Sequence, residues 1–152
     1  MTRSALPLSP SQLGLWRAFK RAHELVLSRI EGELQERADL SGPELGVLSR
    51  LVELGAGQLR QQRLADSMHW EKSRLSHQLS RMAARGLVTR KRDSAKFVTV
   101  VITRSGQRML AAARLVHAEA IRTHLLEAIP ARDHARLARV YRALAGTAVD
   151  DE

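Results

Sequence analysis

Residues 61–92, QQRLADSMHWEKSRLSHQLSRMAARGLVTRKR, decide the fold of this chain. Their pattern predicts a short helix over Gln61–Ser67, a break at Met68–Trp70, and a second helix from about Glu71 to Arg85. Gly86 then occupies the position at which helices commonly end in a left-handed conformation. Two helices joined by so tight a turn indicate a helix-turn-helix. The apolar face of the second helix consists of Leu75, Leu79 and Met82.

The opposite face of the second helix is basic and rich in hydroxyl groups. Lysine and arginine neutralise phosphates, arginine also reaches guanine, and serine and histidine donate hydrogen bonds to phosphates or base edges. We therefore expect this face to bind double-stranded DNA, although an ordinary solvated helix face is the alternative. Its candidate contact residues are Lys72, Ser73, Arg74, Ser76, His77 and Arg81.

Two β-branched segments follow the second helix and predict a hairpin over about residues 87–102, with a polar turn at Asp93–Lys96. A hairpin directly after a helix-turn-helix is a wing. Its basic side chains are further candidates for phosphate contact, with a solvated hairpin as the alternative. They are Arg90, Lys91, Arg92 and Lys96.

Helices are predicted on both sides of this segment. Ser9, Pro10 and Gln12 form a helix start of the capping-box type, and apolar residues then recur at helical spacing for about seven turns. A stripe of this length exceeds what one small core can cover, so we expect it to pack against a second chain. Ser41 and Glu44 begin the next helix in the same way.

The predicted fold class is mainly α with a small β-wing (α+β). A winged helix-turn-helix lobe, residues 41–104, is flanked by an N-terminal dimerisation helix, residues 1–40, and by C-terminal dimerisation helices, residues 105–152. We expect these parts to form one intertwined domain, which agrees with a length of 152 residues.

The charge of the chain is concentrated in its central third. Residues 58–108 hold twelve basic and three acidic side chains, so their surplus equals the formal net charge of +9 of the whole chain. The remaining residues sum to zero. Such a distribution indicates a polyanionic partner for the central segment.

Several classes of function are excluded or disfavoured. Cysteine is absent, which excludes disulfides and thiolate metal sites. The sequence contains no catalytic motif, so an enzyme is not expected. His117 and His124 share a helix face, but no third or fourth metal ligand accompanies them, so no metal site or other cofactor is expected. No apolar stretch is long enough to span a membrane, and the N-terminus does not resemble a signal peptide. We expect a soluble cytoplasmic protein.

Three residues are candidates for lining a small-molecule site: Trp16, His23 and Leu48. For Trp16 and His23 the alternative is packing in the core or against a second chain. Trp70 lies at the turn between the two central helices, where packing is the expected role.

Taken in order, these elements resemble the MarR (multiple antibiotic resistance regulator) transcription factors, over about residues 10–146. The order is a long helix, a helix, a helix-turn-helix, a wing and two terminal helices. Four stretches carry the resemblance, and they are residues 64–65, 70–79, 85–90 and 102–106.

The resemblance implies a homodimer in which the first helix and the last two helices interlock. It implies that the helix from Glu71 enters the major groove of a pseudo-palindromic operator, that the hairpin tip reaches the minor groove, and that a small aromatic or lipophilic molecule binds beneath the reading helices. The function expected is that of a transcription repressor.

One departure from the family pattern concerns the wing tip. The family usually carries Asp-x-Arg there, whereas this chain has the shorter turn Asp93–Lys96, so that Lys96 or Arg92 must replace the arginine. Lysine discriminates groove width less well than a guanidinium does. An architectural DNA-binding protein of low specificity is therefore the alternative function.

Overall fold

The computed structural model describes residues 7–93 and 97–146. It divides into two compact units, which we describe separately. One unit comprises residues 31–120, and the other comprises residues up to 30 together with those from 121 onward. The predicted winged lobe, residues 41–104, falls within the unit 31–120, together with the end of the first helix and nearly all of the helix that follows the wing.

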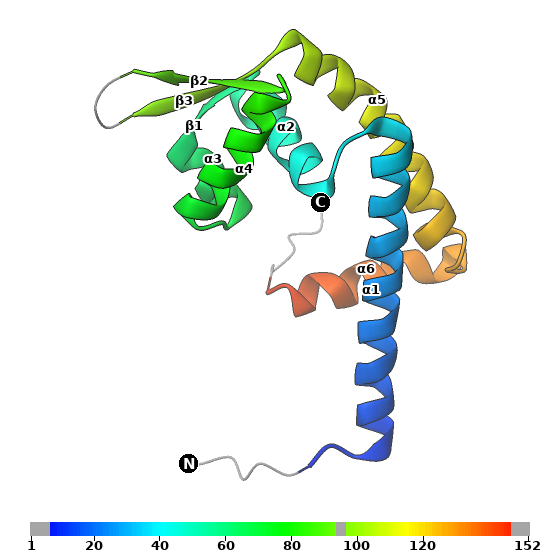
Figure 1. Ribbon diagram of the computed structural model, residues 1–152. Coiled ribbons are helices and arrows are strands. Elements are labelled where there is room, and N and C mark those ends of the chain that lie inside the picture. Colours follow the sequence, from blue (N-terminus) through cyan, green and yellow to red (C-terminus); the bar gives the residue numbers. More distant parts are fainter. Residues whose placement is uncertain (1–6, 94–96, 147–152) are drawn as a thin grey trace, which may run out of the picture. The chain divides into compact units, whose positions relative to one another are not determined.

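The winged lobe contains three helices and a small sheet, and the predicted fold class is confirmed. Its elements are α2 (Gly42–Gly55), β1 (Gln58–Arg60), α3 (Gln61–Met68), α4 (Lys72–Ala84), β2 (Val88–Arg92) and β3 (Val98–Ile102), and α5 (Arg104–Ile121) follows them. The three strands run antiparallel in the order β1-β3-β2, with Leu59 opposite Val100 and Arg90 opposite Val100 on the other side. Figure 1 shows the hairpin of β2 and β3 projecting beyond α3 and α4.

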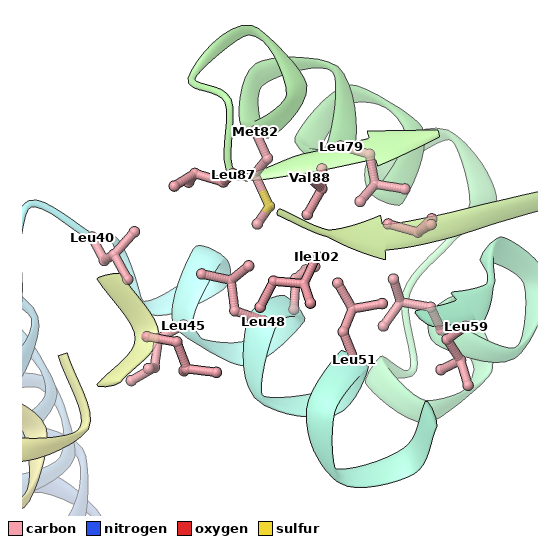
Figure 2. Close-up of a cluster of buried hydrophobic side chains, with 14 of the residues drawn as sticks. Leu40, Leu45, Leu48, Leu51, Leu59, Leu79, Met82, Leu87, Val88 and Ile102 are labelled. Atoms are coloured by element: carbon pink, nitrogen blue, oxygen red, sulfur yellow. The ribbon is translucent and has the colours of Figure 1, made fainter. Parts of the chain in front are cut away.

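One hydrophobic core holds this lobe together. Leu48 and Leu51 of α2 point toward Leu79 and Met82 of α4 and toward Ile102 of β3 (Figure 2). All but Ile102 are fully buried, and Ile102 is 5% exposed. Burying side chains of this size contributes roughly 1.5–3 kcal/mol each, so the core fixes how α4 lies against the sheet.

The helix starts agree with the sequence. The hydroxyl of Ser41 accepts a hydrogen bond from the backbone N–H of Glu44, and the carboxylate of Glu44 accepts one from the N–H of Ser41, which completes a capping box at the start of α2. Ser9 and Gln12 make the same pair of bonds at the start of α1 (Pro10–Ala38).

The turn of the helix-turn-helix is a Schellman motif without glycine. His69 adopts a left-handed conformation with φ 52°, its N–H bonds to the carbonyl of Asp66, and the N–H of Trp70 bonds to the carbonyl of Ala65 at 3.0 Å. Gly86 ends α4 in the same way at φ 70°, as predicted. The C-terminal ends of both helices, α3 and α4, are therefore fixed by backbone hydrogen bonds.

The end of α4, the start of the wing and the start of α5 meet at one joint. The hydroxyl of Thr103 lies 2.6 Å from the carbonyl oxygen of Gly86 and accepts the N–H of Gly106. Gly106 is buried, and a Cβ added there would lie 2.2 Å from the carbonyl oxygen of Leu87. Only glycine allows the backbones to approach so closely here.

The other unit has little core of its own. Its described segments, residues 7–30 and 121–146, hold the first part of α1, a π-helical turn η1 (Arg122–Leu126), a short 3-10 turn η2 (Ala131–Asp133) and α6 (His134–Leu144). Within these segments Ile30 alone is buried. Large apolar side chains are instead exposed, including Leu15 at 74% and Leu144 at 69%. The π-helical turn was not predicted.

Candidate nucleic-acid interface

The outer face of α4 carries the polar side chains that the sequence singled out. Lys72, Ser73, Arg74, His77 and Arg81 are exposed, and Ser76 is half-buried. Leu75, Leu79 and Met82 on the opposite face are fully buried, so the core holds α4 with its donors directed to solvent.

Arg74 is held by an aromatic ring. Its guanidinium lies 4.1 Å from the centroid of the Trp70 ring, within the range of a cation–π interaction. Trp70 is half-buried and packs against the core, as expected. The first turn of α4 therefore presents an exposed arginine whose guanidinium is held against the Trp70 ring.

The wing presents two different faces. Arg90 and Arg92 lie two residues apart on β2 and thus on the same side of the sheet, whereas Lys91 lies on the other side. Arg90 donates a hydrogen bond from Nη2 to the hydroxyl of Ser80 on α4, at 3.1 Å. Arg92 shares with Arg90 and Ser76 a cleft between the wing and α4. Lys96, the remaining predicted wing residue, lies outside the described residues.

Sequence reasoning missed a basic residue beside this cleft. The guanidinium of Arg60, the last residue of β1, lies 4.5 Å from the centroid of the Phe97 ring, and Phe97 directly precedes β3. Together with Gln61 and Lys72, Arg60 lines a second cleft of about 230 Å³. Arg60 ends a strand of only three residues, which is too short for a periodic pattern to mark it as part of a site.

A buried acid anchors the far end of α4. Arg85 donates from Nη1 to Glu44 Oε1 at 2.7 Å and from Nη2 to the carbonyl oxygen of Asp39 at 2.6 Å and to its carboxylate at 2.8 Å. The Glu44 side chain is 6% exposed. Gln78 is also buried on α4 and accepts a hydrogen bond from Arg81. The sequence pattern identified neither contact.

Several solved structures with this arrangement are transcription regulators. The chain is 25% identical to AbsC, a MarR family transcriptional regulator from Streptomyces coelicolor, with a TM-score of 0.83 over 93% of this chain and 97% of that one. A second MarR family regulator from Streptomyces coelicolor, crystallised in complex with DNA, is 23% identical and gives a TM-score of 0.84 over 97% of this chain and 95% of that one. This chain has the MarR winged-helix fold. The resemblance seen in the sequence is confirmed.

Other comparisons add to this result. The model of a domain of unknown function, DUF7343, matches residues 42–93, which comprise most of the MarR-type lobe. A transcriptional regulator described as organohalide-sensing, solved with 2,4-dichlorophenol bound, is 20% identical and gives a TM-score of 0.79 over 91% of this chain and 81% of that one. No curated protein matches the sequence significantly.

The three candidate ligand-lining residues differ in environment. Leu48 is fully buried in the core of the MarR lobe, where its contacts are those of packing. Trp16 and His23 lie on the exposed part of α1, each with its ring centroid 6.0 Å from that of Phe19. Trp16 is 51% exposed.

Among the described residues, no group of three or more metal-ligand side chains comes together. None of the described helices combines the length and the apolar character that a membrane span requires.

Proposed function

We propose that the protein is a sequence-specific DNA-binding transcription regulator that reads a duplex with α4. The observation that carries this proposal is the continuous polar face formed by α4 and the inner side of the wing. Its donors are exposed above a rigid core, and the surplus positive charge of the chain lies in the same segment. Contact residues on α4 are Lys72, Ser73, Arg74, Ser76, His77 and Arg81, joined by Arg90 and Arg92 of the wing.

The two basic faces of the wing have different roles in this proposal. Arg90 and Arg92 face the side that α4 occupies and can reach phosphates of the bound duplex. Lys91 faces away and contributes only long-range attraction, which salt screens beyond about 8–10 Å. The proposal includes no catalytic step.

We further propose that the regulator is a homodimer. The unit of residues 7–30 and 121–146 exposes a row of large apolar side chains and buries almost none of its own, so a second copy is the partner that would cover it. A symmetric dimer presents α4 twice. Its operator would then be pseudo-palindromic, with half-sites about one helical turn apart.

The alternative is an architectural DNA-binding protein of low specificity, because the shortened wing turn lacks the usual arginine. The test is selection of duplexes from a random-sequence library, followed by titration of the selected duplex against a large excess of random duplex. A specific regulator retains its selected site under this competition. Loss of binding at an excess of about tenfold would support the architectural alternative instead.

Repression is the direction of regulation that we propose. The selected site placed between the promoter and the start of a reporter gene should lower expression when the protein is produced. An increase in expression would instead identify an activator.

A small aromatic or lipophilic effector is the remaining part of the proposal. Trp16, Phe19 and His23 form an exposed aromatic row that a ring-containing ligand can contact, and a structural relative binds 2,4-dichlorophenol. Titration of a Trp70→Phe variant with 2,4-dichlorophenol should quench the fluorescence of Trp16, the one tryptophan left. An unchanged spectrum across a panel of phenols would favour packing as the role of Trp16.

A further inference from the structure

We propose that Trp70 is a positioning residue for Arg74, and that this pairing sets the base preference of α4 at one position of each half-site. The inference rests on the proposed function, in which Arg74 contacts DNA. It assigns a role in recognition to a half-buried residue of the turn that does not itself lie on the reading face.

Three observations fix the position of the Trp70 ring. Its backbone N–H is bonded to the carbonyl oxygen of Ala65, in the motif that His69 closes. Its side chain packs against the hydrophobic core. It directly precedes Glu71, the N-cap of α4, so the ring lies below the first turn of that helix. Trp70 is thus held by the scaffold, independently of any DNA.

Arg74 lies on the exposed surface of α4, within contact distance of the Trp70 ring. The residue is in the first turn of α4 and is exposed, and its guanidinium carbon lies 4.1 Å from the Trp70 ring centroid. Tryptophan is the aromatic side chain that attracts cations most strongly. The stack engages a face of the guanidinium, and its N–H donors remain able to bond to a guanine edge or a phosphate.

The consequence for recognition follows from side-chain entropy. A free arginine on a helix surface samples many rotamers and loses this freedom when it binds a base. An arginine already held on a ring loses less, so it binds more tightly and in a defined direction. Lys72, two residues earlier, has a hydrated ammonium group and makes no cation–π contact with a ring of the described residues.

The experiment is a double-mutant cycle on the full chain, with a duplex selected by the wild-type protein as the probe. We expect Arg74→Ala to weaken binding about 10- to 100-fold. Trp70→Leu, which keeps an apolar side chain against the core, should weaken it about three- to tenfold. In the Arg74→Ala background Trp70→Leu should change affinity by no more than about twofold, the usual error of additivity. Trp70→Phe, which keeps a ring, should restore most of the affinity.

Two further readouts separate positioning from simple support of the fold. A repeated selection with Trp70→Leu should lose its base preference at one position of each half-site and keep the rest of the site. In DNA-free protein, the NMR signals of the Arg74 Cδ protons should lie upfield because of the ring current and should return to ordinary values in Trp70→Leu.

The possible failures are distinguishable. If the wild-type protein enriches no duplex in the selection, the proposed function itself is overturned. Wild-type binding with an equal loss for Trp70→Leu in both backgrounds, or an unchanged base preference, would overturn the role of Trp70 alone. Ordinary Arg74 chemical shifts in the wild-type protein would do the same without any use of DNA.

Discussion

Arg85 and Glu44 join two parts of the winged lobe that are 41 residues apart in the chain. Arg85 is the C-cap of α4, and its Nη1 lies 2.7 and 2.8 Å from the two carboxylate oxygens of Glu44 in the first turn of α2. Glu44 also serves in the capping box of α2. One buried carboxylate therefore completes a helix start and fixes the end of the helix that we propose to enter the major groove.

Removal of this ion pair should destabilise the protein. Arg85→Ala leaves Glu44 buried without its cationic partner, and an unpaired buried charge is costly. Because the Arg85 side chain is 32% exposed, we expect a loss of about 1–3 kcal/mol in the free energy of unfolding, measured by urea denaturation.

The matched control is Arg114→Ala. Arg114 pairs with Glu53 at 2.9 Å, but both side chains are largely exposed. Exposed pairs contribute about 0–1 kcal/mol, so this substitution should cost clearly less than Arg85→Ala. Equal losses in the two variants would show that burial of Glu44 does not determine the strength of the first pair.

Gly106 should tolerate no side chain. Gly106→Ala places a methyl group against the carbonyl oxygen of Leu87, which is backbone and cannot move aside. We expect a loss of roughly 1–3 kcal/mol, seen as a lower thermal midpoint. In Gly32→Ala the added methyl meets no atom within 4 Å, and a gain of about 0.5–1 kcal/mol is expected in the helix. A higher thermal midpoint for Gly106→Ala would contradict the close packing of Gly106 against the backbone of Leu87.

Local signals in the sequence were sufficient for most of the fold. The capping residues Ser41 and Glu44 and the glycine at position 86 act through their immediate neighbours, so their structures could be predicted. His69 adopts a left-handed turn without being glycine, and no composition rule marks it. The π-helical turn at Arg122–Leu126 likewise has no signal in the apolar periodicity of the sequence.

The two faces of the wing should differ in the salt dependence of DNA binding. Arg92→Gln removes a charge on the side that α4 occupies, so the slope of log affinity against log salt should become shallower by about one unit. Lys91→Gln removes the same charge from the opposite side of the same strand and should change the slope much less. Titrations at several salt concentrations with the selected duplex measure both. Identical slopes in the two variants would contradict the proposal that only the Arg90 and Arg92 side of the wing faces the duplex.

The apolar face of α6 should control assembly. Val140 and Leu144 lie one turn apart and are 47% and 69% exposed. If a second copy covers them, Val140→Glu with Leu144→Glu should shift the protein from dimer to monomer in sedimentation experiments, because burying an unpaired carboxylate is strongly unfavourable. Leu54→Glu, at a similarly exposed position in the winged lobe, should leave the dimer intact. A wild-type monomer would contradict the proposed assembly directly.

The candidate interface was predictable only as a list of residue types. The sequence placed Arg74 and Trp70 near the turn but assigned them separate roles, because a contact between side chains depends on rotamers that periodicity does not report. Arg85 was counted among the basic residues, yet its guanidinium is engaged by Glu44 and Asp39. Charge alone did not separate arginines available to a ligand from those that hold the fold.

The joint at Gly86, Thr103 and Gly106 has a consequence for how such proteins diverge. Since the end of α4 and the starts of the wing and α5 are bonded to one another there, α4 cannot tilt on its own without breaking those bonds. In the proposed dimer, substitutions that adapt the protein to a different distance between half-sites would therefore accumulate in the segments that join the two copies. Residues 39–106 would be inherited as a block, with substitutions confined to the exposed side of α4.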